Sequence, residues 1–181
     1  MTGEPPGASW IFGYGSLIWR PDLDFLRATP ATLAGYTRRF WQGSHDHRGT
    51  PDAPGRVVTL IPEDGALCGG MAYLVDENVR AETFERLDFR EKNGYERFDV
   101  HLSLDDGAAV TGLVYIAPVD NFAYLGEAPL REIALQIRAS VGPSGRNIDY
   151  LTELADALRG LGYHDDHVFA LESLAIQEQD A

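Results

Sequence analysis

The stretch Trp10-Ile11-Phe12-Gly13-Tyr14-Gly15-Ser16-Leu17 is a short apolar run that ends in two closely spaced glycines. The apolar residues predict a buried strand, and the glycines allow backbone conformations that other residues avoid. Successive N–H groups in such a loop can converge on an anion, although the same residues also fit a plain tight turn. The stretch is neither a dinucleotide fingerprint nor a phosphate loop, because it lacks the third glycine and a following Gly-Lys-Ser/Thr.

Further short strands are expected after this stretch, with Gly, Pro, Asn and Asp marking the turns between them. The apolar and β-branched runs predict strands over residues 32–41, 57–61, 66–75, 95–104 and 110–117. We expect a bend at Gly35, and either a bulge or close packing at Gly69 and Gly70. The turn at 105–107 joins the last two strands into a hairpin.

Apolar residues at helical spacing dominate the last third of the chain and also occur once between the strands. Helices are predicted over residues 77–90, from Pro129 onward, around 150–158 and over 166–177. Asp76 is placed to cap the first of them. Because strands come first and helices last, without a repeating strand–helix period, the sequence predicts an α+β fold. We expect a mixed sheet or small β-barrel flanked by helices.

The composition limits the classes of partner. The chain has 181 residues, 44% of them hydrophobic, which is enough for the core of one domain. It carries 15 basic and 28 acidic residues, a net charge of −13. Because phosphate contacts need clustered Lys and Arg, this charge argues against a general nucleic-acid binder and against docking on an anionic membrane. Residues 1–60 hold six arginines against five acids, so a small anion is expected to bind there.

Cys68 is the sole cysteine, so neither an intrachain disulfide nor a cluster of thiolate metal ligands is expected. Its apolar neighbours favour a buried structural thiol over a nucleophile. The N-terminal residues show no signal-peptide pattern, and no apolar run approaches the roughly 20 residues that span a bilayer. We therefore expect a cytoplasmic protein that does not bind membranes; its oligomeric state is left open.

A candidate proton carrier stands at the end of the predicted helix 77–90, in Arg90-Glu91-Lys92-Asn93-Gly94-Tyr95. A carboxylate near a helix C-terminus is disfavoured by the helix dipole. If Glu91 lies in a partly apolar pocket, its pKa will be raised and it can carry a proton at neutral pH. The alternative is a solvated run of charges.

Two polar clusters contain residues that bind metals elsewhere. The first is 45–47 (HDH) and the second is 164–167 (HDDH). Together they fit the ligand types of a metal-dependent hydrolase, but loop hydrogen bonding and helix capping explain them as well. We predict no metal site. Arg48 and Arg56 are carboxylate-binding candidates because the guanidinium pairs with both carboxylate oxygens; structural ion pairs are the alternative.

Several motifs resemble those of the ChaC family of glutathione-specific γ-glutamylcyclotransferases, both in their residues and in their order along the chain. The motifs are 12–19 (FGYGSLIW), 35–36 (GY), 38–44 (RRFWQGS), 46–51 (DHRGTP), 54–60 (PGRVVTL), 90–92 (REK), 94–95 (GY) and 142–147 (GPSGRN). The resemblance extends from about Trp10 to Glu172. It implies the γ-glutamylcyclotransferase-like fold, in one domain that we place at residues 10–178. We expect residues 1–9 to be disordered or loosely held.

The resemblance also implies an activity, the cleavage of glutathione to 5-oxoproline and cysteinylglycine without metal or cofactor. It places the catalytic glutamate at Glu91 and the substrate loop at Ile11, Phe12, Gly13, Tyr14, Gly15, Ser16 and Leu17. Arg48 is a further substrate-binding candidate. Asn93 replaces a usual glycine, and Asn tolerates the left-handed conformation expected there. Activity on other γ-glutamyl peptides or amines, and a non-catalytic small-molecule binding protein, remain alternatives.

Overall fold

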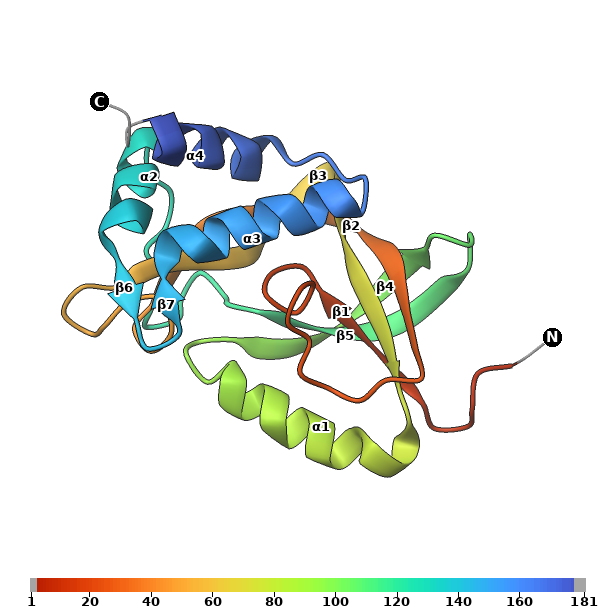
Figure 1. The fold of residues 1–181 in the computed structure, drawn as a ribbon. Coiled ribbons are helices and arrows are strands. Elements are labelled where there is room, and N and C mark those ends of the chain that lie inside the picture. Colours follow the sequence, from red (N-terminus) through yellow and green to blue (C-terminus); the bar gives the residue numbers. More distant parts are fainter. Residues whose placement is uncertain (1–2, 178–181) are drawn as a thin grey trace.

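A closed five-stranded β-barrel forms the centre of the computed structural model, which describes residues 3–177 (Figure 1). The barrel strands are β1 (Ser9–Gly13), β2 (Arg27–Ser44), β3 (Gly55–Val75), β4 (Glu96–Leu104) and β5 (Ala109–Ile116). Their order around the barrel is β1-β3-β2-β4-β5, and the parallel pairing of β1 with β5 closes it. The other pairs are antiparallel, so the predicted mixed barrel is confirmed.

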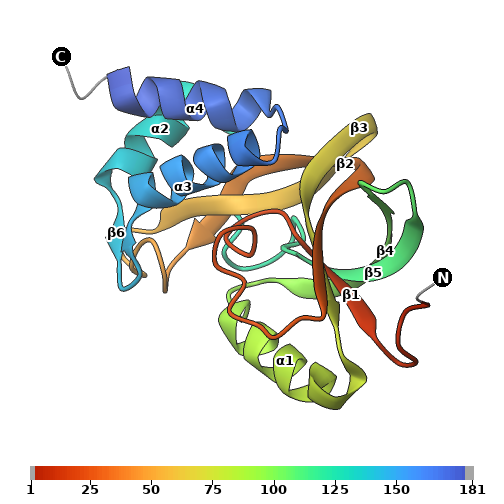
Figure 2. The same cartoon turned by 45° about the vertical axis from the view of Figure 1, so that its right-hand side comes forward.

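Helices cover two opposite sides of this barrel (Figures 1 and 2). One side carries α1 (Glu77–Arg90), and the other carries α2 (Leu130–Ala139), α3 (Asn147–Gly160) and α4 (Asp166–Gln177). Between α2 and α3, β6 (Val141–Gly142) and β7 (Gly145–Arg146) form a small hairpin. The predicted helices are confirmed, and Asp76 caps α1 by accepting a hydrogen bond from Asn78 N. None of the helices in residues 3–177 is long and apolar enough to cross a membrane.

The long β2–β3 hairpin differs from the sequence prediction. Residues 57–61 and 66–75 belong to one strand, β3, rather than to two, and β2 extends beyond the predicted 32–41 at both ends. The two strands pair along most of their length, with a register shift opposite Gly35, between the pairs Ala34–Leu67 and Tyr36–Pro62. Gly35 has a φ of +82°, so the predicted bend is present. The sequence predicts a break in β3 because its apolar pattern is interrupted between residues 61 and 66. It does not show that β3 pairs with β2 again beyond the register shift.

Gly69 and Gly70 are positions of close packing and not of a bulge. Pairing with β2 runs through both without a shift, through Thr32 and Ala31. A Cβ atom at Gly70 would lie 2.2 Å from the carbonyl oxygen of Gly13 at the end of β1. The absence of a side chain therefore lets β3 approach the strand that leads into the proposed substrate loop.

Two apolar clusters hold the layers together. The larger fills the barrel and the space under α2, α3 and α4; its most buried members include Phe12, Phe40, Leu60, Leu102, Ile137, Leu151 and Leu154. The smaller lies between the barrel and α1 and includes Ile11, Leu17, Tyr73 and Leu87. Because β1 contributes to both clusters, the loop that follows it is held where the layers meet.

The domain limits stay a prediction. Of the predicted limits, residues 1, 2 and 178 lie outside the described part of the chain. Within it, Glu4 accepts a 2.7 Å hydrogen bond from Trp10 Nε1, and Arg80 Nη1 donates to Gly7 O at 3.1 Å.

Candidate active site

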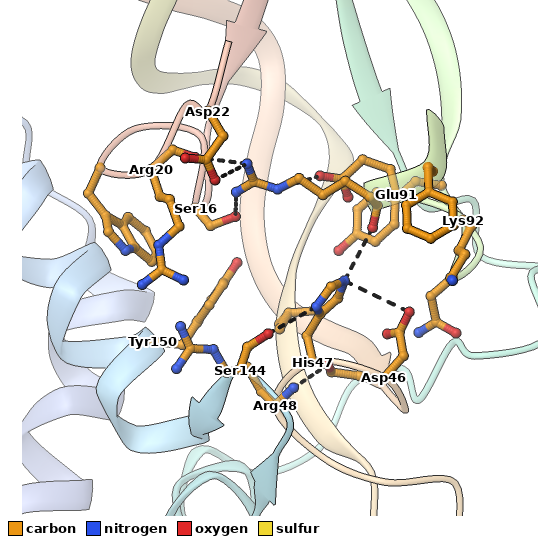
Figure 3. Close-up of a pocket in the computed structure, with 17 residues that line it drawn as sticks. Ser16, Arg20, Asp22, Asp46, His47, Arg48, Glu91, Lys92, Ser144 and Tyr150 are labelled. Carbon is orange, nitrogen blue, oxygen red and sulfur yellow. Dashed lines mark hydrogen bonds and ion pairs between the residues drawn. The ribbon is translucent and has the colours of Figure 1, made fainter. Parts of the chain in front are cut away.

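A cavity of about 430 Å³ lies where the loop after β1, the loop after β2, the end of α1 and the β6–β7 hairpin meet (Figure 3). It is lined by Ser16, Trp19, Arg20, Asp22, Ser44, Asp46, His47, Arg48, Val57, Phe89, Arg90, Glu91, Lys92, Asn93, Tyr95, Ser144 and Tyr150. A smaller hollow of about 40 Å³ adjoins it and is lined by Phe12, Tyr14, Gly15, Ser16, Leu17, Val58, Glu91, Tyr95, Tyr115 and Tyr150. Ser16, Glu91, Tyr95 and Tyr150 line both spaces.

Glu91 stands at the junction of the two spaces, directly after α1. Its N–H donates to Leu87 O at 2.8 Å, and its carbonyl accepts from Tyr95 N at 3.3 Å. These bonds fix the backbone, so the carboxyl group is held by the helix end and the following turn. Only 17% of its side chain is exposed. Glu91 therefore lies largely buried beside the hollow and not in a solvated run of charges.

Burial raises the pKa of Glu91 to about 7 from its ordinary value of 4.5. The Arg90 guanidinium, whose Nε lies 3.8 Å from Glu91 Oε1, opposes this rise, and the negative charge of Asp46 adds to it. The pKa values of Tyr14, Tyr95 and Tyr150 are raised, first by burial and further by the charge of Glu91. A carboxyl group that titrates near neutral pH can both accept and donate a proton.

The loop Tyr14–Leu17 is fixed through its side chains and carbonyl groups. Tyr14 Oη donates to Tyr115 O at 2.6 Å, and Leu17 O accepts from Tyr73 Oη at 2.6 Å. Among residues 3–177, no hydrogen bond is found from the N–H groups of Gly15, Ser16 and Leu17. These three residues also line the hollow beside Glu91. The arrangement provides backbone donors for a negatively charged group.

Most of the predicted substrate loop reaches the hollow, but part of it does not. Phe12 lines the hollow together with residues 14–17. Ile11 and Gly13 line neither space. The Ile11 side chain is buried in the apolar cluster against α1, because it lies on the strand face opposite to that of Phe12.

Of the two arginines predicted to bind a carboxylate, one lines the cavity and the other does not. Arg48 lines the large cavity, where its Cζ lies 5.7 Å from the ring centroid of Tyr150. Arg56 does not, and its guanidinium donates to Gln136 Oε1 and to the carbonyl groups of Phe40 and Gly126. Arg56 is thus held by structural hydrogen bonds to neutral groups and not by the ion pair given as its alternative, and it is not placed to bind a carboxylate in the cavity.

The two histidine clusters do not form a metal site. Within residues 3–177, no group of three or more His, Cys, Asp and Glu side chains is placed to hold a metal ion. His167 Nε2 accepts a hydrogen bond from Phe40 N at 3.0 Å, and burial lowers its pKa to about 4. His47 lies at the active-site cavity, 3.1 Å from Ser144 Oγ through Nδ1 and 3.3 Å from Arg90 O through Nε2.

Asn93 does not adopt the expected left-handed conformation; Gly94 does, with a φ of +94°. The Asn93 side chain instead donates to Gly43 O at 2.9 Å, and the backbone carbonyl of Asn93 accepts from Gln42 Nε2 at 2.9 Å. Asn93 therefore ties the turn after Glu91 to the end of β2, a contact that glycine cannot make.

Several cavity residues were given no role in the site from the sequence, although some of them stand in the motifs quoted above. They are Trp19, Arg20, Lys92, Tyr95, Ser144 and Tyr150. Trp19 ends the quoted motif 12–19 and Arg20 follows it, but nothing in the local sequence indicated that their side chains reach the cavity. Tyr150 comes from α3, far along the chain, so only the packing of α3 on the barrel brings it to Glu91.

The chain is similar to characterised proteins along nearly its whole length. The sequence model of the family described as ChaC-like protein matches residues 9–178. Gamma-glutamylcyclotransferase 2-3 of Arabidopsis thaliana is 46% identical over 169 residues, covering 89% of this chain and 85% of the relative. Glutathione-specific gamma-glutamylcyclotransferase 1 of Danio rerio is 43% identical over 170 residues, covering 91% and 87%.

A solved structure agrees with this relationship. The crystal structure of a yeast γ-glutamyl cyclotransferase specific to glutathione superimposes with a TM-score of 0.88 at 31% sequence identity. The superposition covers 94% of this chain and 96% of the yeast chain. The match in sequence and in fold, over nearly the full length of both partners, shows that this chain belongs to the ChaC family.

Proposed function

We propose that this protein cleaves glutathione into 5-oxoproline and cysteinylglycine, with Glu91 as the group that moves the proton. The proposal is carried by one observation: the buried Glu91, with a pKa near 7, shares a hollow with Gly15, Ser16 and Leu17, whose N–H groups have no hydrogen-bond partner within residues 3–177. It is supported by relatives in Danio rerio and Homo sapiens, which are named for glutathione.

The reaction is an intramolecular acyl transfer. The α-amino nitrogen of the γ-glutamyl group attacks the γ-carbonyl carbon, and the bond from that carbon to the cysteinyl nitrogen breaks. Two protons leave the α-nitrogen and two are gained by the cysteinyl nitrogen, one of them through the Glu91 carboxyl group. The substrate is its own nucleophile, so the enzyme needs none. A site that folds the γ-glutamyl arm for attack supplies much of the rate.

The raised pKa matters for the first proton transfer. An ordinary glutamate, with a pKa of 4.5, is a weak base toward an α-ammonium group with a pKa of about 8. At a pKa of about 7, Glu91 accepts that proton at a much smaller cost in free energy. It then returns a proton to the departing cysteinyl nitrogen.

The loop amides have two possible partners on the substrate. The N–H groups of Gly15, Ser16 and Leu17 hold either the α-carboxylate of the γ-glutamyl group or the oxyanion that forms at the γ-carbonyl. Both roles place the reacting carbon beside Glu91. The Arg48 guanidinium, on another part of the cavity wall, is the candidate for the carboxylate at the far end of the substrate.

Replacement of the proposed base tests the assignment. Glu91→Gln should retain the fold and bind glutathione, yet lose nearly all release of 5-oxoproline. Glu85→Gln, at an exposed position of the same helix, is the matched control and should keep full activity. The assignment fails if Glu91→Gln releases 5-oxoproline at a rate comparable with the control.

Release of 5-oxoproline, together with binding and competition measurements, also tests the two alternative functions. A non-catalytic binding protein would bind glutathione in calorimetry and release no 5-oxoproline. An enzyme for other γ-glutamyl compounds would prefer γ-glutamyl-alanine or a γ-glutamylamine in direct competition with glutathione. A cytoplasmic location is part of the proposal, in keeping with the lone buried thiol of Cys68, and cell fractionation tests it.

A further inference from the structure

Two arginine side chains, Arg20 and Arg48, lie in the wall of the large cavity. Arg20 comes from the segment after β1, and Arg48 from the loop after β2. Figure 3 shows both on the Tyr150 side of the cavity, apart from Glu91. Arg20 is exposed and Arg48 is buried. Arg38 and Arg56 differ from both, because they line neither the cavity nor the hollow and donate to several protein groups.

Of this pair, Arg48 has one long ion pair, whereas Arg20 has no acidic partner within residues 3–177. Arg48 donates to Arg146 O at 3.1 Å, and its nearest carboxylate oxygen, Glu153 Oε2, lies 4.0 Å away. For the Arg20 side chain, no hydrogen bond or ion pair is found within residues 3–177. Burial lowers the pKa of Arg48, the negative charge of Glu153 opposes this, and the positive charge of Arg20 adds to the lowering.

The acidic residues of the cavity do not supply the missing partner. Asp22 Oδ2 pairs with Arg90 Nη1 at 3.6 Å, and Asp46 Oδ2 lies 3.8 Å from His47 Nε2. Next to Arg20, the Trp19 ring packs edge-on against Tyr150, and its buried Nε1–H has no hydrogen-bond partner in the described chain. This wall therefore contains two guanidinium groups of like charge. It also contains a neutral donor, Trp19 Nε1–H, that has no partner in the described chain.

We propose that Arg20 and Arg48 form a carboxylate-binding pair that selects γ-glutamyl peptides with a free C-terminal carboxylate over γ-glutamylamines and amidated peptides. The inference rests on the proposed function, since it concerns the end of the substrate that leaves as cysteinylglycine. A guanidinium group binds a carboxylate through two parallel hydrogen bonds. An anion between the two arginines also removes their mutual repulsion. The cavity volume of about 430 Å³ is within the usual range for small-ligand sites.

The experiment compares glutathione with glutathione whose glycine carboxylate is amidated, with 5-oxoproline release as the readout. The enzymes are the wild type, Arg20→Gln, and the control Arg86→Gln, which removes one positive charge at an exposed position of α1 outside the cavity. For the wild type, kcat/KM should fall by about tenfold or more on amidation, since a charge-assisted hydrogen bond is lost. Arg20→Gln should lose a similar factor on glutathione, mainly through KM, and none on the amide.

The outcomes separate this inference from the proposed function. Equal kcat/KM of the wild type on both substrates, or an equal loss on both in Arg20→Gln, would overturn the pair's role while leaving glutathione cleavage intact. No 5-oxoproline from either substrate would overturn the proposed function itself. Because Arg20 is exposed, thermal unfolding of Arg20→Gln should match that of Arg86→Gln. Calorimetric binding of glutathione to Glu91→Gln, with and without Arg20→Gln, measures the same loss without turnover.

Discussion

Arg90 Nη2 donates a hydrogen bond of 2.7 Å to Ser16 Oγ and so ties the end of α1 to the proposed substrate loop (Figure 3). The same guanidinium donates to Arg20 O at 2.8 Å and lies 3.8 Å from Glu91 Oε1. One side chain therefore positions the loop and also favours the ionised form of the neighbouring carboxyl group.

Arg90→Gln should move the acid limb of the kcat/KM profile to higher pH. The limb of the wild type is expected near pH 7, where Glu91 gains its proton in the free enzyme. Without the positive charge of Arg90, the pKa of Glu91 rises further, so a higher pH is needed to ionise it. Arg90→Lys keeps the charge and should leave the limb near its original position, while its weaker hold on Ser16 raises KM. An unchanged limb in Arg90→Gln would contradict this role.

The stability of the fold should depend on pH through Glu91. The folded pKa, about 7, lies above the ordinary 4.5, so ionised Glu91 destabilises the folded state. This cost is absent below about pH 4.5, grows as the pH rises, and is complete above about pH 7. Glu91→Gln lacks it and should exceed the wild type in unfolding free energy by ~1 kcal/mol at pH 5.5 and ~3 kcal/mol at pH 8.5.

Urea unfolding at the two pH values checks this dependence. Glu85→Gln, on the exposed surface of α1, should follow the wild type at both. A constant difference between Glu91→Gln and the wild type would mean that Glu91 is ionised as easily in the folded chain as in the unfolded one.

Gly15→Ala should block the hollow without unfolding the protein. A Cβ atom at Gly15 would lie 2.9 Å from Tyr150 Oη and from Val58 Cγ2, both of which belong to residues that line the hollow. We expect kcat/KM to fall by at least about tenfold, since small misplacements of reacting groups cost rate steeply. Gly160→Ala, where an added Cβ meets nothing within 4 Å, should keep full activity. Wild-type activity in Gly15→Ala would place the reaction outside the hollow.

The helices and most of the strands could be predicted from the sequence because their signals are local, although β3 was predicted as two strands. The two central segments of the candidate site were visible as local patterns, and their roles came from the resemblance to the ChaC family. The glycines after β1 and the charged run after α1 are each visible within a few residues. That these two segments meet, and that Arg90 joins them, depends on the closed barrel, which local patterns do not determine.

Local sequence patterns could not predict which side chains from distant helices and strands reach the cavity. Tyr150 on α3 reaches the cavity only because α3 packs against the barrel. The sequence does not show which arginine reaches the cavity. Arg20 is exposed at the cavity, whereas Arg56 is buried and donates to Gln136. The burial of an arginine and its hydrogen-bond partners decide whether it binds substrate or supports the fold. Both depend on the three-dimensional structure.

Arg38 illustrates this difference and leads to a last prediction. Its side chain, 2% exposed, donates to Tyr14 O at 2.7 Å, to Asp165 Oδ2 at 2.7 Å and to Gly69 O. Asp165 in turn accepts from Val168 N in the first turn of α4. Arg38 thus links the base of the substrate loop to β3 and to α4, and it lines neither the cavity nor the hollow.

Arg38→Met should therefore destabilise the fold by ~3–5 kcal/mol, because it leaves the Asp165 carboxylate and two carbonyl groups without their donor. Arg20→Gln, at an exposed position, should change the unfolding free energy by no more than ~0.5 kcal/mol. Urea unfolding of both variants measures the contrast, and the double variant Arg38→Met/Asp165→Leu should recover part of the loss, since the unpaired charge is removed. If Arg38→Met is as stable as the wild type but inactive, Arg38 acts in the reaction and is not part of the frame that holds the loop.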